Sequence, residues 1–337
     1  MHSRRKGNRR SNTNGLRKSE TFEDFYGSHY GERWAALRKA LCAPACDRSV
    51  LWNKFVKLPF ESAMGDVKRV DDALLLQLFS PLGSGEMPPP AIDEFNVKAH
   101  YPLDYTTALA VELLGVQQFD LVLDLCAGVG GKSIAISQFL SNSASLTANE
   151  QRGDRCARLR RNIKEYVPSN YVPVTVTQRK PETWHDPSTY HRVLVDAPCT
   201  GERQLLQHSG KHAVSPLHWS LQACVELSHT QRGLLLRSIE TCRPGGRIVY
   251  TTCSISPLEN DEVVREALKR TRCQVELMHP PVPIGEKTEF GHIVLPDRDN
   301  GRGPAYYCVI HKISDKREES EDEDEDEDGN DDDSTSS

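Results

Sequence analysis

Two cysteines stand directly after two apolar segments of the sequence, where thiol chemistry is possible. Cys199 follows the segment 192–196, in the stretch Asp-Ala-Pro-Cys-Thr-Gly, and Cys253 follows the segment 247–252. If both segments are parallel strands, their carboxyl ends meet at one edge of a sheet and both thiols face the same cleft. A single free cysteine is usually an inert buried residue, but two at equivalent positions are less easily explained by burial. We therefore expect Cys199 and Cys253 to share an active site.

A glycine-rich loop follows an earlier apolar segment, 119–125, and opens the next expected helix. The loop consists of Cys126, Ala127, Gly128, Val129, Gly130, Gly131 and Lys132. Glycines at such a place let backbone N–H groups approach a ligand at the N-terminus of a helix. A Walker A loop would need glycine in place of Cys126, and a dinucleotide-binding loop would need glycine in place of Ser133, so neither pattern fits.

A third interpretation of this loop is the methyl-donor loop of Rossmann-like methyltransferases. In that arrangement an acidic residue at the end of the second strand holds the ribose hydroxyls of the donor. Glu150, twenty residues after Gly130, stands in a suitable position. The alternative is that the loop is only a tight turn and Glu150 only a solvated surface residue, neither of which binds a ligand. The succession of strand, glycine turn and helix favours donor binding.

A thiol beside a methyl-donor pocket suits the methylation of carbon 5 of cytosine, which is a poor nucleophile. A thiolate that adds to C6 breaks the aromaticity of the ring and makes C5 an enamine carbon that attacks a methyl sulfonium. The carboxyl group of Asp196 is placed to hydrogen-bond the N3/N4 edge of the base and stabilise the adduct. The second thiol would assist the later elimination.

These motifs resemble the two cysteine motifs of the NOL/NOP/SUN-domain RNA cytosine-5 methyltransferases. The resemblance covers roughly residues 100–313 and includes the stretch Thr-Thr-Cys-Ser-Ile-Ser-Pro-Leu-Glu-Asn around Cys253. It implies that Cys253 is the nucleophile, that Cys199 helps to release the product and that Asp196 is the family's aspartate after the fourth strand. It also implies that residues 126–132, Glu150 and Asp196 bind S-adenosylmethionine.

Within that family, the chain is similar to the branch that modifies mitochondrial small-subunit rRNA. The similarity lies in Phe25-Tyr26 with Trp34, in 155–159 and in 303–308. It implies an RNA substrate, with a helical-repeat protein or the small ribosomal subunit as partner, and a place in the mitochondrial matrix. The arginine-rich, acid-free N-terminus partly matches a transit peptide but lacks an apolar face, so a nuclear or nucleolar location is the alternative.

The chain departs from the family pattern at two places. Gly128-Val129 replace Ala-Pro in the donor loop, and Lys180 stands where the family commonly has an aspartate near the adenine of the donor. A lysine there removes an acceptor and adds a positive charge beside a sulfonium. The alternative function is therefore a non-catalytic ribosome-assembly or RNA-binding factor with the methyltransferase fold. Retention of both cysteines argues against it, because a scaffold needs neither thiol.

The elements that must position these residues alternate regularly between strand and helix. Apolar strands in such alternation predict an α/β, Rossmann-like methyltransferase fold with a doubly wound, mostly parallel sheet. The expected strands are 119–125, 145–149, 173–177, 192–196 and 247–252, and the expected helices are 105–114, 132–140, 154–166, 221–242 and 259–270.

The remainder of the chain divides by composition. We expect a basic disordered leader at 1–18, a helical N-terminal region with a Pro/Gly linker at 19–95, the methyltransferase domain at 96–313 and an acidic disordered tail at 314–337. Near-helical spacing of apolar residues over 22–41 is followed by further helical patterns at 51–60 and 71–79, and 81–90 has the composition of a linker.

The net charge of −6 conceals a strong segregation of charge. Residues 1–18 carry seven basic and no acidic residues, and residues 318–337 carry thirteen acidic and no basic ones. The segment between them is therefore neutral overall. Candidate RNA contacts are the basic leader and the stretch 203–218.

Composition also excludes several classes of protein. No apolar run is long enough to span a membrane, and no secretory signal is visible. Ten scattered cysteines fit a reducing compartment, and Cys42 and Cys46 lack the partners of a zinc finger. The histidines 208, 212 and 218 are better explained by a mobile, solvated loop than by a metal site, so no metal is expected.

Overall fold

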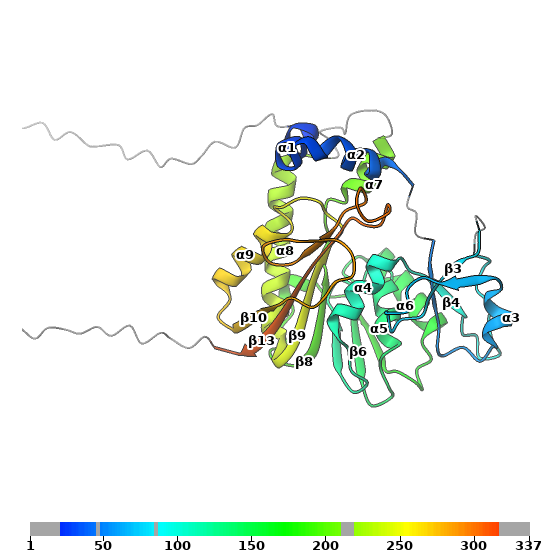
Figure 1. Cartoon of the computed structure of the whole chain (residues 1–337). Helices are drawn as coiled ribbons and strands as arrows, with labels where there is room; N and C mark the ends of the chain where they lie inside the picture. Colours follow the sequence, from blue (N-terminus) through cyan, green and yellow to red (C-terminus); the bar gives the residue numbers. More distant parts are fainter. Residues whose placement is uncertain (1–20, 45–47, 84–86, 210–218, 317–337) are drawn as a thin grey trace, which may run out of the picture.

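The computed structural model describes residues 21–44, 48–83, 87–209 and 219–316. Its centre is a nine-stranded sheet in the order β11-β12-β13-β9-β8-β5-β6-β7, with β10 paired to β13. The pairs from β9 to β7 are parallel, whereas the strands from β13 outward pair antiparallel. Helices cover both faces (Figure 1). The predicted doubly wound, mostly parallel sheet is therefore confirmed.

The helices and strands of this domain follow the predicted alternation. The strands are β5 (Leu121–Asp124), β6 (Ser145–Asn149), β7 (Val174–Thr177), β8 (Tyr190–Asp196), β9 (Cys242–Thr252), β10 (Gln274–Met278), β11 (Glu286–Lys287), β12 (His292–Val294) and β13 (Ala305–Ser314). The helices are α4 (Tyr105–Leu114), α5 (Gly131–Ser137), α6 (Gly153–Tyr166), η2 (Pro181–Thr183), α7 (Glu202–Ser209), α8 (Leu221–Thr241) and α9 (Asp261–Arg270).

Two hydrophobic cores hold the helices on the sheet. Because side chains alternate along a strand, Val122 of β5 packs with α4, α5 and α6 on one face, while its neighbour Leu123 packs with α8 and α9 on the other. The same alternation places Leu194 of β8 in the first core and Val193 in the second. The sheet is thus buried on both faces, which leaves its carboxyl edge as the place for ligands.

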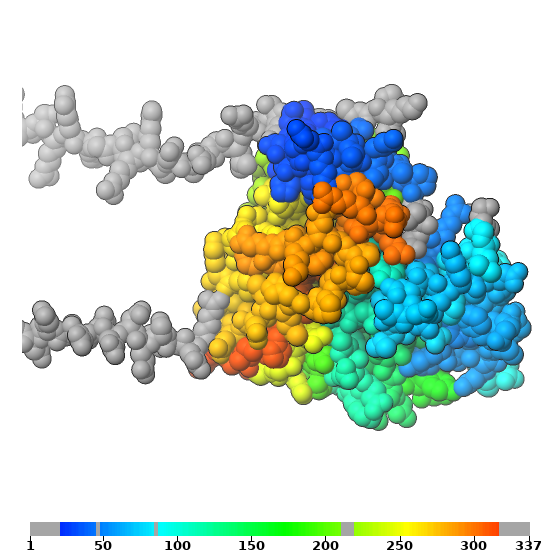
Figure 2. Space-filling view, in the orientation of Figure 1, coloured from blue at the N-terminus to red at the C-terminus, as the bar shows by residue number. Residues whose placement is uncertain are grey.

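The N-terminal helices pack over that edge. α1 (Phe22–Tyr30) begins with a capping box between Thr21 and Asp24, and it continues through η1 (Gly31–Arg33) into α2 (Trp34–Cys42). Their aromatic residues form a third core with residues of α7, α8 and the segment after β9. In the space-filling view these helices (blue) lie against the orange segment near the C-terminal end of the domain, where Arg33 pairs with Asp297 (Figure 2).

The predicted helices at 51–60 and 71–79 are wrong. The structure instead has β1 (Val50–Trp52), a short α3 (Phe60–Met64), β2 (Val67–Arg69) and β3 (Leu78–Pro81), which form an antiparallel sheet with β4 (His100–Pro102) in the order β2-β3-β1-β4. Short apolar runs suit either a strand or a helix, and here pairing of β1 with β3 and β4 decides for the strand. The predicted domain boundary at 95 stays a prediction, with β4 of this small sheet beyond it.

Several predictions concern segments that the structure does not describe. The basic leader, most of the acidic tail, and residues 84–86 of the expected linker lie outside the described residues. Among the helices that the structure describes, none is long and apolar enough to cross a membrane.

Candidate active site

The two predicted thiols meet at the carboxyl edge of the sheet. β8 and β9 are parallel neighbours, with Asp196 opposite Thr251, so the loops after them begin side by side. Cys199 Sγ lies 2.6 Å from Cys253 Sγ, and the backbone N–H of Cys253 donates to Cys199 Sγ at 3.2 Å. Both cysteines are free. The hydrogen bond with Cys253 and burial together raise the pKa of the Cys199 thiol.

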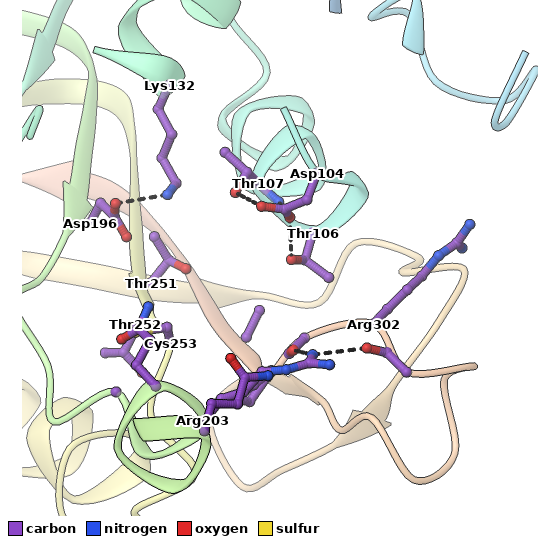
Figure 3. Close-up of a pocket in the computed structure, with 17 residues that line it drawn as sticks. Asp104, Thr106, Thr107, Lys132, Asp196, Arg203, Thr251, Thr252, Cys253 and Arg302 are labelled. Carbon is purple, nitrogen blue, oxygen red and sulfur yellow. Dashed lines mark hydrogen bonds and ion pairs between the residues drawn. The ribbon is translucent and has the colours of Figure 1, made fainter. Parts of the chain in front are cut away.

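A cavity of about 320 Å³ opens beside these strand ends (Figure 3). Of the two thiols, Cys253 lines the cavity and Cys199 does not. Lys132 and Asp196 also line it, and Lys132 Nζ lies 2.7 Å from Asp196 Oδ2. Burial alone would lower the pKa of Lys132, but the charge of Asp196 outweighs it and the pKa is raised. Further polar residues of the wall are Asp104, Thr106, Thr107, Arg203 and Arg302.

Two fully buried carboxyl groups, Glu202 and Glu259, lie behind the thiols. The Thr200 hydroxyl lies 2.6 Å from Glu202 Oε1 and 2.5 Å from Glu259 Oε1. The Ser254 hydroxyl lies 2.8 Å and 3.0 Å from the same two atoms. Each hydroxyl carries one hydrogen, so it donates to only one of the two carboxyl groups at a time. Burial and the charge of Glu202 raise the pKa of Glu259. A proton on Glu259 therefore relieves the repulsion between the two carboxylates.

This carboxyl pair ties the two cysteine loops to distant elements. Tyr26 of α1 donates its hydroxyl to Glu202 Oε1 at 2.5 Å, and Gln231 of α8 donates from Nε2 to Glu259 Oε2 at 2.8 Å. Neither glutamate was predicted as a site residue. The sequence signal that could have found them is an acidic residue within six positions after each cysteine.

The predicted donor loop lies between β5 and α5 at the same edge of the sheet. Gly128 and Gly130 have φ values of 60° and 100°, which favour glycine. A Cβ at Gly128 would lie 2.5 Å from Arg155 Nη2. Glu150 follows β6 and is buried, and its Oε2 lies 3.5 Å from Arg155 Nε. A close-approach backbone at a helix N-terminus and an acid after the neighbouring strand fit a nucleoside methyl donor.

Asp124 closes β5 immediately before the donor loop. Its side chain is fully buried, and the Ser133 hydroxyl donates to its Oδ2 at 2.6 Å. Burial, reinforced by the charge of Asp196, raises the pKa of Asp124 to about 7. Asp124 was not predicted as a site residue, although its place at the end of the first parallel strand was a signal.

The remaining predicted features lie apart from this edge or cannot be placed. Lys180 is exposed between β7 and η2 and does not line the cavity. His208 is exposed on α7, while His212, His218 and Cys46 lie outside the described residues. Within the described part of the chain, no group of three or more His, Cys, Asp or Glu residues is placed to hold a metal ion.

Residues 111–309 match the family model for 16S rRNA methyltransferase RsmB/F. This chain belongs to that family. The match spans the donor loop, both cysteine motifs and most of the central sheet, whereas Tyr26 and the cavity residues Asp104, Thr106 and Thr107 lie before the matched range.

Named relatives of this RsmB/F protein are RNA cytosine-5 methyltransferases. It is 30% identical over 339 residues to the 5-cytosine rRNA methyltransferase NSUN4 of Mus musculus, covering 87% of the chain and 88% of the relative. It is 26% identical to the mouse mitochondrial tRNA (cytosine(34)-C(5))-methyltransferase, covering 87% of the chain and 89% of the relative. The match to NSUN4 of Xenopus tropicalis is 32% identical and spans 58% of that relative.

A solved structure supports the same fold for the RsmB/F chain. NSun6 from Pyrococcus horikoshii with SFG, an analogue of S-adenosylmethionine, has a TM-score of 0.69 and 17% sequence identity, covering 88% of this chain and 99% of that one. The predicted family, Rossmann-like fold, methyltransferase class and methyl donor are thus confirmed.

Proposed function

We propose that this protein is an S-adenosylmethionine-dependent RNA cytosine-5 methyltransferase that acts on rRNA, with Cys253 as its nucleophile. The observation that carries the proposal is the pair of thiols after two adjacent parallel strands, of which Cys253 faces the cavity that also holds Asp196. Cys253 lines that cavity and Cys199 does not, which supports Cys253 as the nucleophile.

The residues of the cavity supply distinct parts of the reaction. The Cys253 thiolate adds to C6 of cytosine, and Asp196, oriented by Lys132, accepts a hydrogen bond from the N4 edge as charge develops on the ring. Bound S-adenosylmethionine supplies an electrophilic methyl group to C5. A base then takes the C5 proton, the electron pair of that C–H bond re-forms the C5–C6 double bond, and Cys253 leaves C6 as a thiolate. Cys199, in contact with Cys253 Sγ, is placed to assist that release.

Residues 126–132 and Glu150 would hold the donor beside this cavity. Their backbone N–H groups and carboxylate offer contacts to its amino-acid and ribose parts. The target base must leave any stack to reach Cys253, so the substrate is an unpaired or flippable cytosine.

The biological setting is the finer part of the proposal. Two of the three relatives given above are named as rRNA methyltransferases, which favours rRNA, and the tRNA methyltransferase is named as mitochondrial, which favours the mitochondrial matrix. A helical-repeat protein or the small ribosomal subunit is the proposed partner. Imaging of a fusion with a free N-terminus tests the location, and a nucleolar signal would contradict it.

The test of the activity uses labelled S-adenosylmethionine and rRNA with the full chain. We expect Cys253→Ala to abolish methyl transfer to cytosine, because the base can no longer be activated at C6. We expect Cys199→Ala to accumulate a covalent protein–RNA adduct, visible on a denaturing gel, because product release is impaired. Cys156→Ala, which changes a buried cysteine on α6 away from the cavity, is the matched control. A Cys253→Ala variant that still methylates cytosine would overturn the nucleophile, and absence of donor binding by calorimetry would favour a non-catalytic factor.

A further inference from the structure

A second cavity, of about 680 Å³, lies on the far side of the donor-binding region from the thiols. It runs between α6, the edge strand β7 and two loops of the N-terminal region. Three aromatic residues line it: Phe55, Phe95 and Tyr171. Phe55 is buried, but Phe95 is 65% exposed and Tyr171 is 37% exposed. Aromatic rings left open in a groove indicate a surface that another molecule covers.

The loops that present these rings are held rigidly. Asp93 accepts hydrogen bonds at its Oδ1 from the backbone N–H groups of Phe95 and Val97, both at 2.9 Å. Its Oδ2 accepts from the N–H of Lys57 at 2.8 Å. The N–H of Tyr171 donates to the carbonyl of Pro168 at 2.9 Å. The backbone that carries the exposed rings is therefore held in place, which lowers the entropic cost of ordering these loops on binding.

The rings stand close to positive charge. Lys57 Nζ lies 5.3 Å from the centroid of the Tyr171 ring, which in turn lies 5.6 Å from the Phe55 ring. Arg160 and Lys164 of α6 also line the groove, and no acidic residue is among the described lining residues. The nearby Glu165 is paired with Lys98 at 2.6 Å. The groove is thus apolar at its base and cationic at its rim.

The positive charge continues along α6 towards the active site. Arg158 and Arg161 are exposed on the same helix. These two arginines, like Arg160 and Lys164, form no ion pair with another described residue. α6 begins three residues after Glu150, and its 14 residues span ~21 Å. A polyanion that enters the active-site edge can therefore follow α6 down to the groove.

We propose that this groove binds a single-stranded segment of the RNA substrate, distant from the target cytosine. Bases stack on Phe95 and Tyr171, and backbone phosphates contact Lys57, Arg160 and Lys164. The combination of exposed rings with a cationic rim favours single-stranded nucleic acid over a protein helix, whose apolar face would need no row of cations. The inference rests on the proposed function only in taking RNA as the substrate.

The test measures binding of a fluorescent single-stranded RNA of about 20 nucleotides to the full chain, by anisotropy and without methyl donor. For the double variant Phe95→Ala/Tyr171→Ala we expect a Kd at least about fivefold higher, because stacking is lost. For Lys57→Gln/Arg160→Gln/Lys164→Gln we expect the slope of log Kd against log salt to fall by about 2, because about three phosphate contacts are lost.

Two controls separate binding from folding. Phe119→Ala changes a phenylalanine that is 59% exposed but does not line the groove, and we expect its Kd to match the wild type. Phe95→Trp/Tyr171→Phe keeps an aromatic ring at each position, so it should retain affinity even if the alanine pair folds poorly.

Unchanged RNA affinity in the folded alanine variant would overturn the proposal. If that variant also lost association with a protein of the ribosome, the groove would be a protein-docking surface instead. The two proposals fail in different assays. The proposed function fails if Cys253→Ala still transfers methyl groups, whereas the groove is tested by RNA binding alone.

Discussion

At the scale of single residues, the site depends on charges that burial holds close together. Asp124, Glu202 and Glu259 are all fully buried within the methyltransferase domain. Burial raises the pKa of Asp124 and of Glu259, and the hydroxyls of Thr200 and Ser254 compensate part of the desolvation cost at Glu259.

Asp124→Asn should change how stability depends on pH. The pKa of Asp124 rises from 3.8 in the unfolded chain to about 7 in the native one. The unfolded state therefore ionises first, and the contribution of this group to stability is lost as pH rises from about 4 to about 7. The asparagine variant does not ionise, so its free energy of unfolding should not show that decrease, which amounts to at most about 4 kcal/mol. Urea unfolding of both proteins near pH 5 and pH 8 measures it, and an identical pH profile would contradict the assignment.

At the scale of elements, α1 and α2 connect the N-terminal region to the catalytic loops. Both helices were predicted correctly from apolar spacing, and their buried aromatic residues explain why that spacing exists. Their link to the active site is polar and runs through the Tyr26 hydroxyl to Glu202 and then to the loops of both cysteines. α1 is thus part of the support for the thiols as well as a cover for the sheet edge.

Tyr26→Phe tests that support. Removal of the hydroxyl leaves a buried carboxyl group with one donor fewer, so we expect a loss of stability of about 1–3 kcal/mol. Tyr30→Phe is the matched control, because its hydroxyl donates to the neutral carbonyl of Ile255 at 2.7 Å, and it should cost less. Denaturant unfolding gives both values, and equal losses would show that the carboxyl pair has no special need for Tyr26.

At the scale of the whole molecule, charge is distributed very unevenly. The basic leader and the acidic tail flank a neutral middle, yet α6 carries a row of exposed cations along one side of the methyltransferase domain. A chain with a net charge of −6 can therefore still present a cationic path to RNA. The tail is a polyanion within the same molecule, so we expect it to compete with RNA for such a path.

Removal of residues 318–337 should strengthen RNA binding. It deletes thirteen acidic residues and no basic ones, so the repulsion of the phosphate backbone falls. We expect the Kd for single-stranded RNA to fall several-fold at low salt and the difference to disappear at high salt, where charges are screened. Equal affinity at low salt would show that the tail has no influence on RNA.

The sequence alone determined the central fold and the neighbourhood of the thiols. Apolar strands alternating with helices specify a parallel sheet, and the end of each strand is a fixed place in such a sheet, so Cys199, Cys253, Asp196 and Glu150 could be assigned to one edge in advance. Local patterns carry this information because each strand is buried by its own adjacent helix.

Only the tertiary structure decided the features that depend on contacts between distant segments. β1 is a strand because β3 and β4 pair with it, which its own short apolar run does not reveal. Three further features depend on the direction of side chains from different elements. Cys253 rather than Cys199 faces the cavity, Glu202 lies close to Glu259 and Tyr26, and a cationic groove opens beside α6. Such directions are set by packing, which sequence spacing does not encode.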